Sequence, residues 1–344
     1  MSRDRFSVAT FNLYNLQLPG DAMNPGQRPW TDDEFALKLE WIARQLTVLD
    51  ADVVGLQELW SREAMERVLA DPALDGEYDL LAGPANGRKI VCGALVRKGL
   101  LRGTPRWVED FPPELRLESS GNDAQAPDVS VTIPGFSRPV LNFQVALREQ
   151  PPLTEVFVAH LKSKLPERVY TEDWFEENED VFKPHALALG AALATIRRTA
   201  EATALRILLT TAMKGTVTPV LVLGDVNDGQ HSNTVNILTE QPRYLVGESR
   251  GGVDTGLYTA QTLQEYRDTR DVYYTHVHND LRESLDHILV SEQFYDNSRR
   301  RLWLFDGLTI NNDHLNEENH RETGTGDHGI VRVDFAWRPF TPTR

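Results

Sequence analysis

The sequence has few cysteines and no long apolar stretch, and each shortage excludes a class of protein. Cys92 is the only cysteine, so no disulfide can form within the chain. The absence of any run of about 18 apolar residues excludes a transmembrane helix. The polar start Met-Ser-Arg-Asp-Arg also lacks the apolar stretch of a signal peptide. We therefore expect a cytoplasmic protein without stable membrane association.

Positive charge is also scarce. The chain has 36 Lys and Arg residues against 51 Asp and Glu residues, which gives a net charge of −15. Because a basic face supplies most non-specific affinity for nucleic acid, this balance counts against a strong non-catalytic binder of DNA or RNA. A nuclease stays possible, since carboxylates that hold a divalent cation are negative and the bound cation inverts the local field.

What is present is a globular pattern in which short apolar runs alternate with helical ones. Hydrophobic residues make up 40% of the chain, enough for a sizeable core. We expect strands at 7–13, 52–56, 90–96, 156–160, 220–223, 285–290 and 330–335, and helices at 31–49 and 184–213. No repeat or linker interrupts the alternation, so the sequence predicts a single α/β domain over 1–344. The stretch 102–139, rich in Pro, Gly and Ser, is expected to be a specificity insertion of loops and edge strands.

Polar side chains cluster where the apolar runs stop. These residues are Asn12, Glu58, His160, Asp225, Asn227, Asp286, Asp327 and His328. Taken singly, each fits a structural role better: Asp225 as a helix N-cap, Glu58 as a solvated residue opening a helix at 61–70, and His160 as a hydrogen-bonded core histidine. The spacing of His276 and His278 suits a metal, but we favour their interpretation as surface polar residues.

Taken together, the residue types indicate phosphodiester hydrolysis. That reaction needs a cation, a base for water and donors that hold the phosphate. Glu58 and Asp327 are oxygen ligands of the kind Mg²⁺ prefers, and Asn12 adds a neutral one. Histidine is the usual base at neutral pH, and Asp286 is the candidate carboxylate behind it.

Asp225 and Asn227 are expected to act on the same group. If the segment is extended, residues two apart point to the same side. A carboxylate and an amide would then converge on one phosphate or water.

The order of these motifs resembles that of the endonuclease/exonuclease/phosphatase superfamily. The motifs are Asn12, Gln57-Glu58, His160, Gly-Asp225-Val-Asn227, Ser-Leu-Asp286-His and Gly-Asp327-His328. The superfamily includes deoxyribonucleases, abasic-site endonucleases, bacterial sphingomyelinases and inositol-polyphosphate 5-phosphatases. The resemblance spans residues 12–328 and implies a four-layer α/β sandwich, in which two mixed β-sheets pack face to face with helices outside.

The resemblance also implies roles for the catalytic side chains. His328 would be the general base, oriented by Asp286. Asp225 would position the water or protonate the leaving group, and Asn227 and His160 would bind the phosphate. His160 resembles the deoxyribonuclease and sphingomyelinase pattern, since the abasic-site enzymes usually carry a tyrosine in that role.

The metal group implied by the resemblance is Glu58 with Asn12 and Asp327. These residues would hold Mg²⁺ or Mn²⁺, and Ca²⁺ is a further option.

Three functions remain open at this point. The leading hypothesis is a divalent-metal-dependent nuclease acting on DNA or RNA. The second is a phosphodiesterase or phosphatase for a small or lipid-derived phosphate, which the net charge mildly favours because a long polyanion would be repelled. The third is a non-catalytic binding protein on the same fold, which should have lost part of the polar set, whereas here every position is filled.

Overall fold

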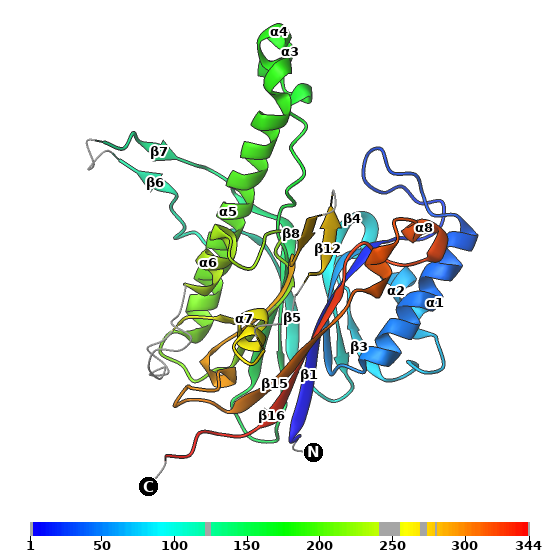
Figure 1. Ribbon diagram of the computed structural model, residues 1–344, viewed down its shortest axis with the longest axis vertical. Coiled ribbons are helices and arrows are strands. Elements are labelled where there is room, and N and C mark those ends of the chain that lie inside the picture. Colours follow the sequence, from blue (N-terminus) through cyan, green and yellow to red (C-terminus); the bar gives the residue numbers. More distant parts are fainter. Residues whose placement is uncertain (1–2, 121–124, 241–254, 269–273, 279–280, 343–344) are drawn as a thin grey trace.

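Two six-stranded β-sheets form the centre of the protein. The computed structural model describes residues 3–120, 125–240, 255–268, 274–278 and 281–342 (Figure 1). The first sheet has the strand order β15-β16-β1-β2-β4-β3, and the second has the order β11-β14-β10-β9-β8-β5. Both sheets are mixed and helices lie outside them, so the expected four-layer α/β sandwich is confirmed.

The strands have the following bounds. The first sheet contains β15 (Trp303–Asn311), β16 (Ile330–Trp337), β1 (Arg5–Leu16), β2 (Val53–Ser61), β4 (Asn86–Arg97) and β3 (Tyr78–Leu81). The second sheet contains β11 (Tyr258–Thr259), β14 (Asp286–Val290), β10 (Val220–Asp225), β9 (Thr154–His160), β8 (Gly135–Val145) and β5 (Leu101–Asp110). Two small hairpins are β6 (Glu118–Ser119) with β7 (Val129–Ser130) and β12 (His276–His278) with β13 (Leu281–Glu283).

Helices cover the outer faces of both sheets. The α-helices are α1 (Asp32–Leu49), α2 (Arg62–Leu69), α3 (Asp173–Glu176), α4 (Glu179–Phe182), α5 (Ala186–Met213), α6 (Asn233–Thr239), α7 (Ala260–Glu265) and α8 (His320–Thr323). Four 3₁₀ turns are η1 (Val169–Thr171), η2 (Lys183–His185), η3 (Glu292–Phe294) and η4 (Asp313–Asn316). A capping box begins α1, because Thr31 Oγ1 accepts from the Glu34 amide and the Glu34 carboxylate accepts from the Thr31 amide.

Alternation along the strands separates the central core from the two outer cores. In β1, Val8 belongs to the core between the sheets, whereas Ala9 belongs to the core under α1 and α2. In β10, Leu223 faces the central core and Val222 faces α5. The sheets approach closely at Gly55, where an added Cβ would lie 2.9 Å from the Cβ of Leu223.

Strand direction brings the polar clusters to one edge of the sandwich. β1 runs parallel to β2, and β9 runs parallel to β10. β16 and β14 run antiparallel to β1 and β10. The carboxyl ends of β1 and β2 therefore lie beside the start of β16, and those of β9 and β10 beside the start of β14. A hydrogen bond between Asn12 and Asp225 shows that these two edges meet, at the place where ligands bind in many layered α/β proteins.

Two stretches leave the body of the sandwich, and one of them, 102–139, is the expected specificity insertion. Within 102–139, β5 and β8 pair at the edge of the second sheet, and the hairpin of β6 and β7 projects outward (Figure 1). The acidic stretch 172–180 forms α3 and the first part of α4 at the far end of α5, which extends beyond the sheets (Figure 1). The part of 102–139 in substrate choice stays a prediction. Among the described residues, no helix is both long and apolar enough to cross a membrane.

Candidate active site

The carboxylate of Asp225 lies at the centre of the polar edge. Its Oδ2 accepts a hydrogen bond from Asn12 Nδ2 at 3.2 Å. The same oxygen lies 3.5 Å from His160 Nε2 and 3.9 Å from His328 Nε2. Side chains from β1, β9 and the segment before β16 therefore converge on one atom, and all four side chains are buried.

His328 and Asp286 form a buried pair beside this carboxylate. His328 Nδ1 lies 2.8 Å from Asp286 Oδ2. Burial alone would lower the pKa of His328, but the charges of Asp286 and Asp225 and the hydrogen bond hold it well above the usual value. Because Nδ1 is engaged by Asp286, Nε2 is the nitrogen left to exchange a proton on the Asp225 side.

Thr275, which sequence reasoning missed, holds the two segments of this pair together. Its Oγ1 accepts from the amides of Leu285 at 3.0 Å and Asp286 at 3.1 Å. Its carbonyl accepts from the Gly329 amide at 2.7 Å. No local pattern marks a lone threonine for this task, because the contacts join segments far apart in the sequence.

Burial shifts the protonation of the groups around the phosphate position. Burial, with smaller contributions from Asp286 and Glu58, raises the pKa of Asp225 to about 7 against a partial opposing effect of His328. Burial, together with the positive charges of Arg138 and His328, holds the pKa of His160 well below its usual value. Near neutral pH, Asp225 is therefore able to carry a proton and His160 is neutral.

The expectation that Asp225 and Asn227 lie on one extended segment is wrong. β10 ends at Asp225, and Asn227 has φ 56°. The backbone turns because Asp225 Oδ1 accepts from the Asn227 amide at 2.9 Å, the pattern of an Asx turn. The turn brings Asn227 against the end of β9, where its Nδ2 donates to the Leu161 carbonyl at 3.0 Å.

The structural alternative for Asp225 is not realised, because the N-cap of α6 is Ser232. Glu58 does not open the following helix either: it lies within β2, and α2 begins only at Arg62. Asp225 instead has the buried polar neighbours described above.

Glu58 and Asp327 form a second acidic part of the edge. Glu58 Oε2 accepts from the Asn15 amide at 2.9 Å, and Glu58 has φ 57°. Burial, and next the charge of Asp327, raises the pKa of Glu58. A second carboxylate close enough to disfavour the ionisation of Glu58 fits a site for a cation. Asn12 pairs with Gln57, the residue before Glu58, and its Oδ1 accepts from the Tyr14 amide at 3.0 Å, which leaves that oxygen a second lone pair.

Backbone strain gathers at the same edge. Six described non-glycine residues have positive φ, and four of them are Tyr14, Asn15, Glu58 and Asn227. Such conformations cost roughly 1–3 kcal/mol each and persist where the surroundings determine them. Their concentration here is typical of a functional site.

His276 adjoins the site, contrary to the interpretation of this residue as a surface histidine. It is half-buried, and it forms an isolated antiparallel bridge with His328 that places the two ring centroids 5.0 Å apart. His278 is exposed, as expected.

Lys38 is a second residue that the sequence analysis did not select. Its Nζ is buried 5.0 Å from the Tyr14 ring centroid and 4.8 Å from that of Trp30, without a hydrogen bond to any residue that the structure describes. Burial lowers its pKa to about 7, against the charges of Asp327 and Glu58. Its position on the apolar face of α1 was a usable signal, since it follows Phe35 by three residues and precedes Ile42 by four.

Ligand atoms of three His, Cys, Asp or Glu side chains lie within 4.8 Å of one another at two places in the described part of the chain. One group is His276, Asp327 and His328, and the other is Asp225, Asp286 and His328. Glu58 belongs to neither group.

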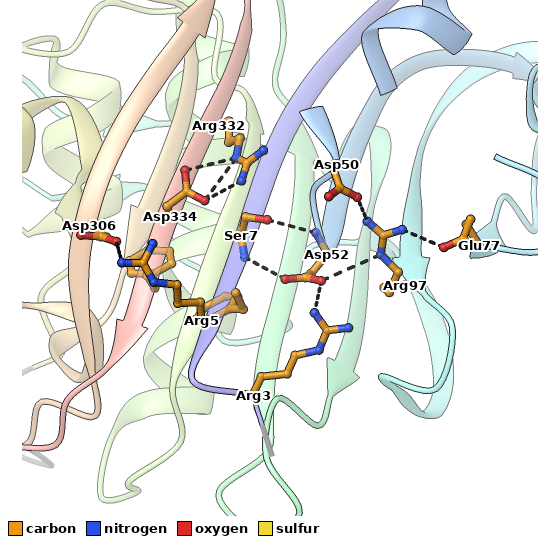
Figure 2. A pocket seen from close by; sticks show the side chains of 12 residues that line it. Arg3, Arg5, Ser7, Asp50, Asp52, Glu77, Arg97, Asp306, Arg332 and Asp334 are labelled. Carbon is orange, nitrogen blue, oxygen red and sulfur yellow. Dashed lines mark hydrogen bonds and ion pairs between the residues drawn. The ribbon is translucent and has the colours of Figure 1, made fainter. Parts of the chain in front are cut away.

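A polar hollow of about 510 Å³ at the opposite edge of the sandwich has a different character (Figure 2). Its arginines already face carboxylates: Arg97 lies 3.0 Å from Glu77 and also binds Asp50, and Arg332 lies 2.7 Å from Asp334. Because these charges are neutralised locally, the hollow is not an anion site comparable to the polar edge.

Comparison with known proteins agrees with this geometry. The model of the "Endonuclease/Exonuclease/phosphatase family" matches residues 9–328. No curated protein matches the sequence significantly.

Several solved structures share the fold at low sequence identity. A structure of Danio rerio TDP2 "complexed with single strand DNA product" has 15% identity and a TM-score of 0.55, covering 97% of this chain and 99% of that one. The catalytic domain of human Nocturnin, with bound sulfate, has 13% identity and a TM-score of 0.54, covering 98% and 96%. A mannosyl-6-phosphatase of Bacteroides thetaiotaomicron has 12% identity and a TM-score of 0.54, covering 96% and 100%. The match of the family model over nearly the whole sequence shows that this chain belongs to the endonuclease/exonuclease/phosphatase family, whose members hydrolyse phosphoester bonds.

Proposed function

We propose that the protein is a divalent-metal-dependent phosphodiester hydrolase, and specifically a nuclease acting on DNA or RNA. The observation that carries this proposal is the buried His328–Asp286 pair, 2.8 Å between Nδ1 and Oδ2, whose other ring nitrogen faces Asp225. If the His328–Asp286 pair only stabilised the fold, it would not require the second ring nitrogen of His328 to face the buried carboxylate of Asp225.

In the proposed reaction, the unprotonated form of His328 takes a proton from water on Nε2 while the water oxygen attacks phosphorus. Asp286 fixes the tautomer and stabilises the imidazolium that forms. The bond from phosphorus to the leaving oxygen breaks, and Asp225 is placed to give that oxygen a proton. Its pKa of about 7 makes the protonated form available near neutral pH.

His160 and Asn227 would hold the phosphate. A neutral His160 offers a ring N–H as a donor, and Asn227 keeps a second amide proton beyond the one it gives to Leu161. Donors fixed by a buried surrounding stabilise charge that develops on the phosphate oxygens.

Glu58, Asn12 and Asp327 would hold the metal ion, Mg²⁺ or Mn²⁺. The donor set consists of two carboxylates and an amide oxygen, which suits a hard cation. The bound ion supplies positive charge for the phosphate oxygens.

A small phosphodiester or phosphomonoester is the second candidate substrate. A polar hollow of about 440 Å³ adjoins Asp327 and is also lined by Glu317 and Glu318. Together with the net charge of −15, these carboxylates favour a compact substrate over a long polyanion.

A turnover panel separates these options. The metal-stripped protein would be assayed with Mg²⁺, Mn²⁺ or Ca²⁺ on supercoiled plasmid, single-stranded DNA, RNA, bis-p-nitrophenyl phosphate and p-nitrophenyl phosphate. Metal-dependent nicking that His328→Ala abolishes supports the nuclease, and its rate should fall steeply with salt. Cleavage of the small esters alone, with a weak salt dependence, moves the substrate to the second class. Silence on every substrate contradicts the proposal.

A further inference from the structure

His276, which the proposed reaction does not use, forms a donor set together with Asp327 and His328. Their ligand atoms lie within 4.8 Å of one another. Two imidazoles and a carboxylate suit borderline transition metals such as Zn²⁺, whereas Mg²⁺ prefers oxygen ligands. We propose that these three side chains form a Zn²⁺-type site, distinct from the oxygen-rich group around Glu58, and that its occupation inhibits the enzyme.

The local geometry presents the two imidazoles side by side. The bridge between His276 and His328 holds their rings at a centroid distance of 5.0 Å and an interplanar angle of 44°. His276 Nδ1 is buried and has no hydrogen-bond partner among the residues that the structure describes. His328 Nδ1 is occupied by Asp286, so His328 offers Nε2 to a metal.

The partner behind His328 supports metal binding as well as base catalysis. Histidines that ligate metals commonly donate their other ring N–H to a carboxylate, which fixes the ring and raises its basicity. Asp286 already has this arrangement with His328. Three protein ligands leave a fourth position of a Zn²⁺ ion for water.

Inhibition follows from the atom that the metal would occupy. A cation on His328 Nε2 takes the lone pair that must accept the proton of the attacking water. Asp327 has two carboxylate oxygens, so it is able to face Glu58 with one and His276 with the other. The inhibition, but not the binding, rests on the proposed function of His328.

Metal binding is measured first, because it needs no substrate. Zn²⁺ is titrated by calorimetry, and Co²⁺ by its visible absorption, into the full-length protein with saturating Mg²⁺. We expect one ion per chain. His276→Asn and His276→Gln should each weaken binding by more than about tenfold, since even partners behind a ligand are worth roughly 10- to 100-fold. The matched control, His278→Asn, changes an exposed neighbour and should leave the affinity unchanged. Equal affinity in wild type and in folded His276 variants overturns the proposal.

A second experiment measures whether bound Zn²⁺ inhibits hydrolysis. With Mg²⁺ present, Zn²⁺ should inhibit the wild-type protein reversibly, and a chelator selective for Zn²⁺ should restore turnover. The two His276 variants should keep their Mg²⁺-dependent rate within about twofold and need at least about tenfold more Zn²⁺ for half inhibition. Loss of the basal rate in these variants would place His276 in the reaction itself and overturn the proposal. If no form of the protein hydrolyses any substrate, the proposed function fails, while the titration still decides the metal site.

Discussion

At the scale of single residues, the site depends on how a few buried groups set one another's protonation. The sequence alone indicated the chemical types at the strand ends, because Asn, Asp, Glu and His after apolar runs are unusual enough to select. It did not indicate Thr275 or Lys38, and it assigned His276 to the surface. Their contacts arise from segments that meet only in the folded chain, and the buried lysine was visible only as a polar residue on an apolar helix face.

Asp286→Asn tests the role of the carboxylate behind His328. Burial lowers the pKa of His328 and Asp286 raises it, so removing the negative charge should move the acid limb of the kcat/KM profile to lower pH. Turnover should fall by roughly 10²- to 10⁴-fold, because the tautomer is no longer fixed. A pH–rate profile and Mg²⁺ calorimetry check both points. A loss of Mg²⁺ affinity as large as the loss of turnover would contradict the assignment.

Asp225→Asn tests the buried carboxyl group through stability. The folded pKa of about 7 exceeds the ordinary 3.8, so this group stabilises the fold fully below about pH 4 and loses that contribution as pH rises through 7. The asparagine has no such loss. In the presence of a metal chelator, the difference between the Tm of the variant and that of the wild type should therefore increase by at least about 2 °C between pH 4 and pH 8. A Tm difference that is constant over this range would show that Asp225 does not titrate as described, even if the variant is inactive.

At the scale of elements, strand and helix positions were largely predictable, but the turns between them were not. The period of the apolar residues located β1, β10, β14 and the capped helix α1. The turn after β10 was predicted wrongly because a side chain of the strand itself, Asp225, bends the backbone by accepting the Asn227 amide. Hydrophobic period carries no information about such a contact.

Thr275→Val is expected to separate β14 from the loop that carries His328. The change keeps the shape of the side chain but removes the acceptor of two buried amides, at a cost of about 1–3 kcal/mol for the unpaired donors. The free energy of unfolding should fall accordingly, and kcat should fall more than KM rises. Thr275→Ser keeps the hydroxyl and serves as the control. Equal kcat values in the valine and serine variants would exclude the proposed role of the Thr275 hydroxyl in holding β14 against the loop that carries His328.

Gly224→Ala tests the close approach of β10 to β9 just before Asp225. An added Cβ would lie 2.0 Å from the Ala159 carbonyl oxygen, so a strand must shift. We expect a destabilisation of about 1–3 kcal/mol by denaturant unfolding, together with loss of activity. Gly229→Ala is the control, since no described atom lies within 4 Å of its added Cβ. Equal stability of the two variants would refute this packing.

At the scale of the whole molecule, the sheet order was beyond the reach of periodicity. β16, the last strand, pairs with β1, and β4 lies between β2 and β3. Local residue patterns do not encode such non-local pairings, so the two-sheet sandwich was implied only by the resemblance to a family. The same pairings explain why residues between 12 and 328 meet at one edge.

The central claim is that His328 is the base, and chemical rescue tests it most directly. The turnover of His328→Ala on bis-p-nitrophenyl phosphate would be measured with saturating Mg²⁺ or Mn²⁺, with and without added imidazole. The account predicts a loss of roughly 10²-fold or more, partly restored by imidazole with a pH dependence that follows the free base. A folded His328→Ala variant that retains the wild-type rate would contradict this claim. So would a variant that has lost both turnover and metal binding and whose turnover imidazole does not restore.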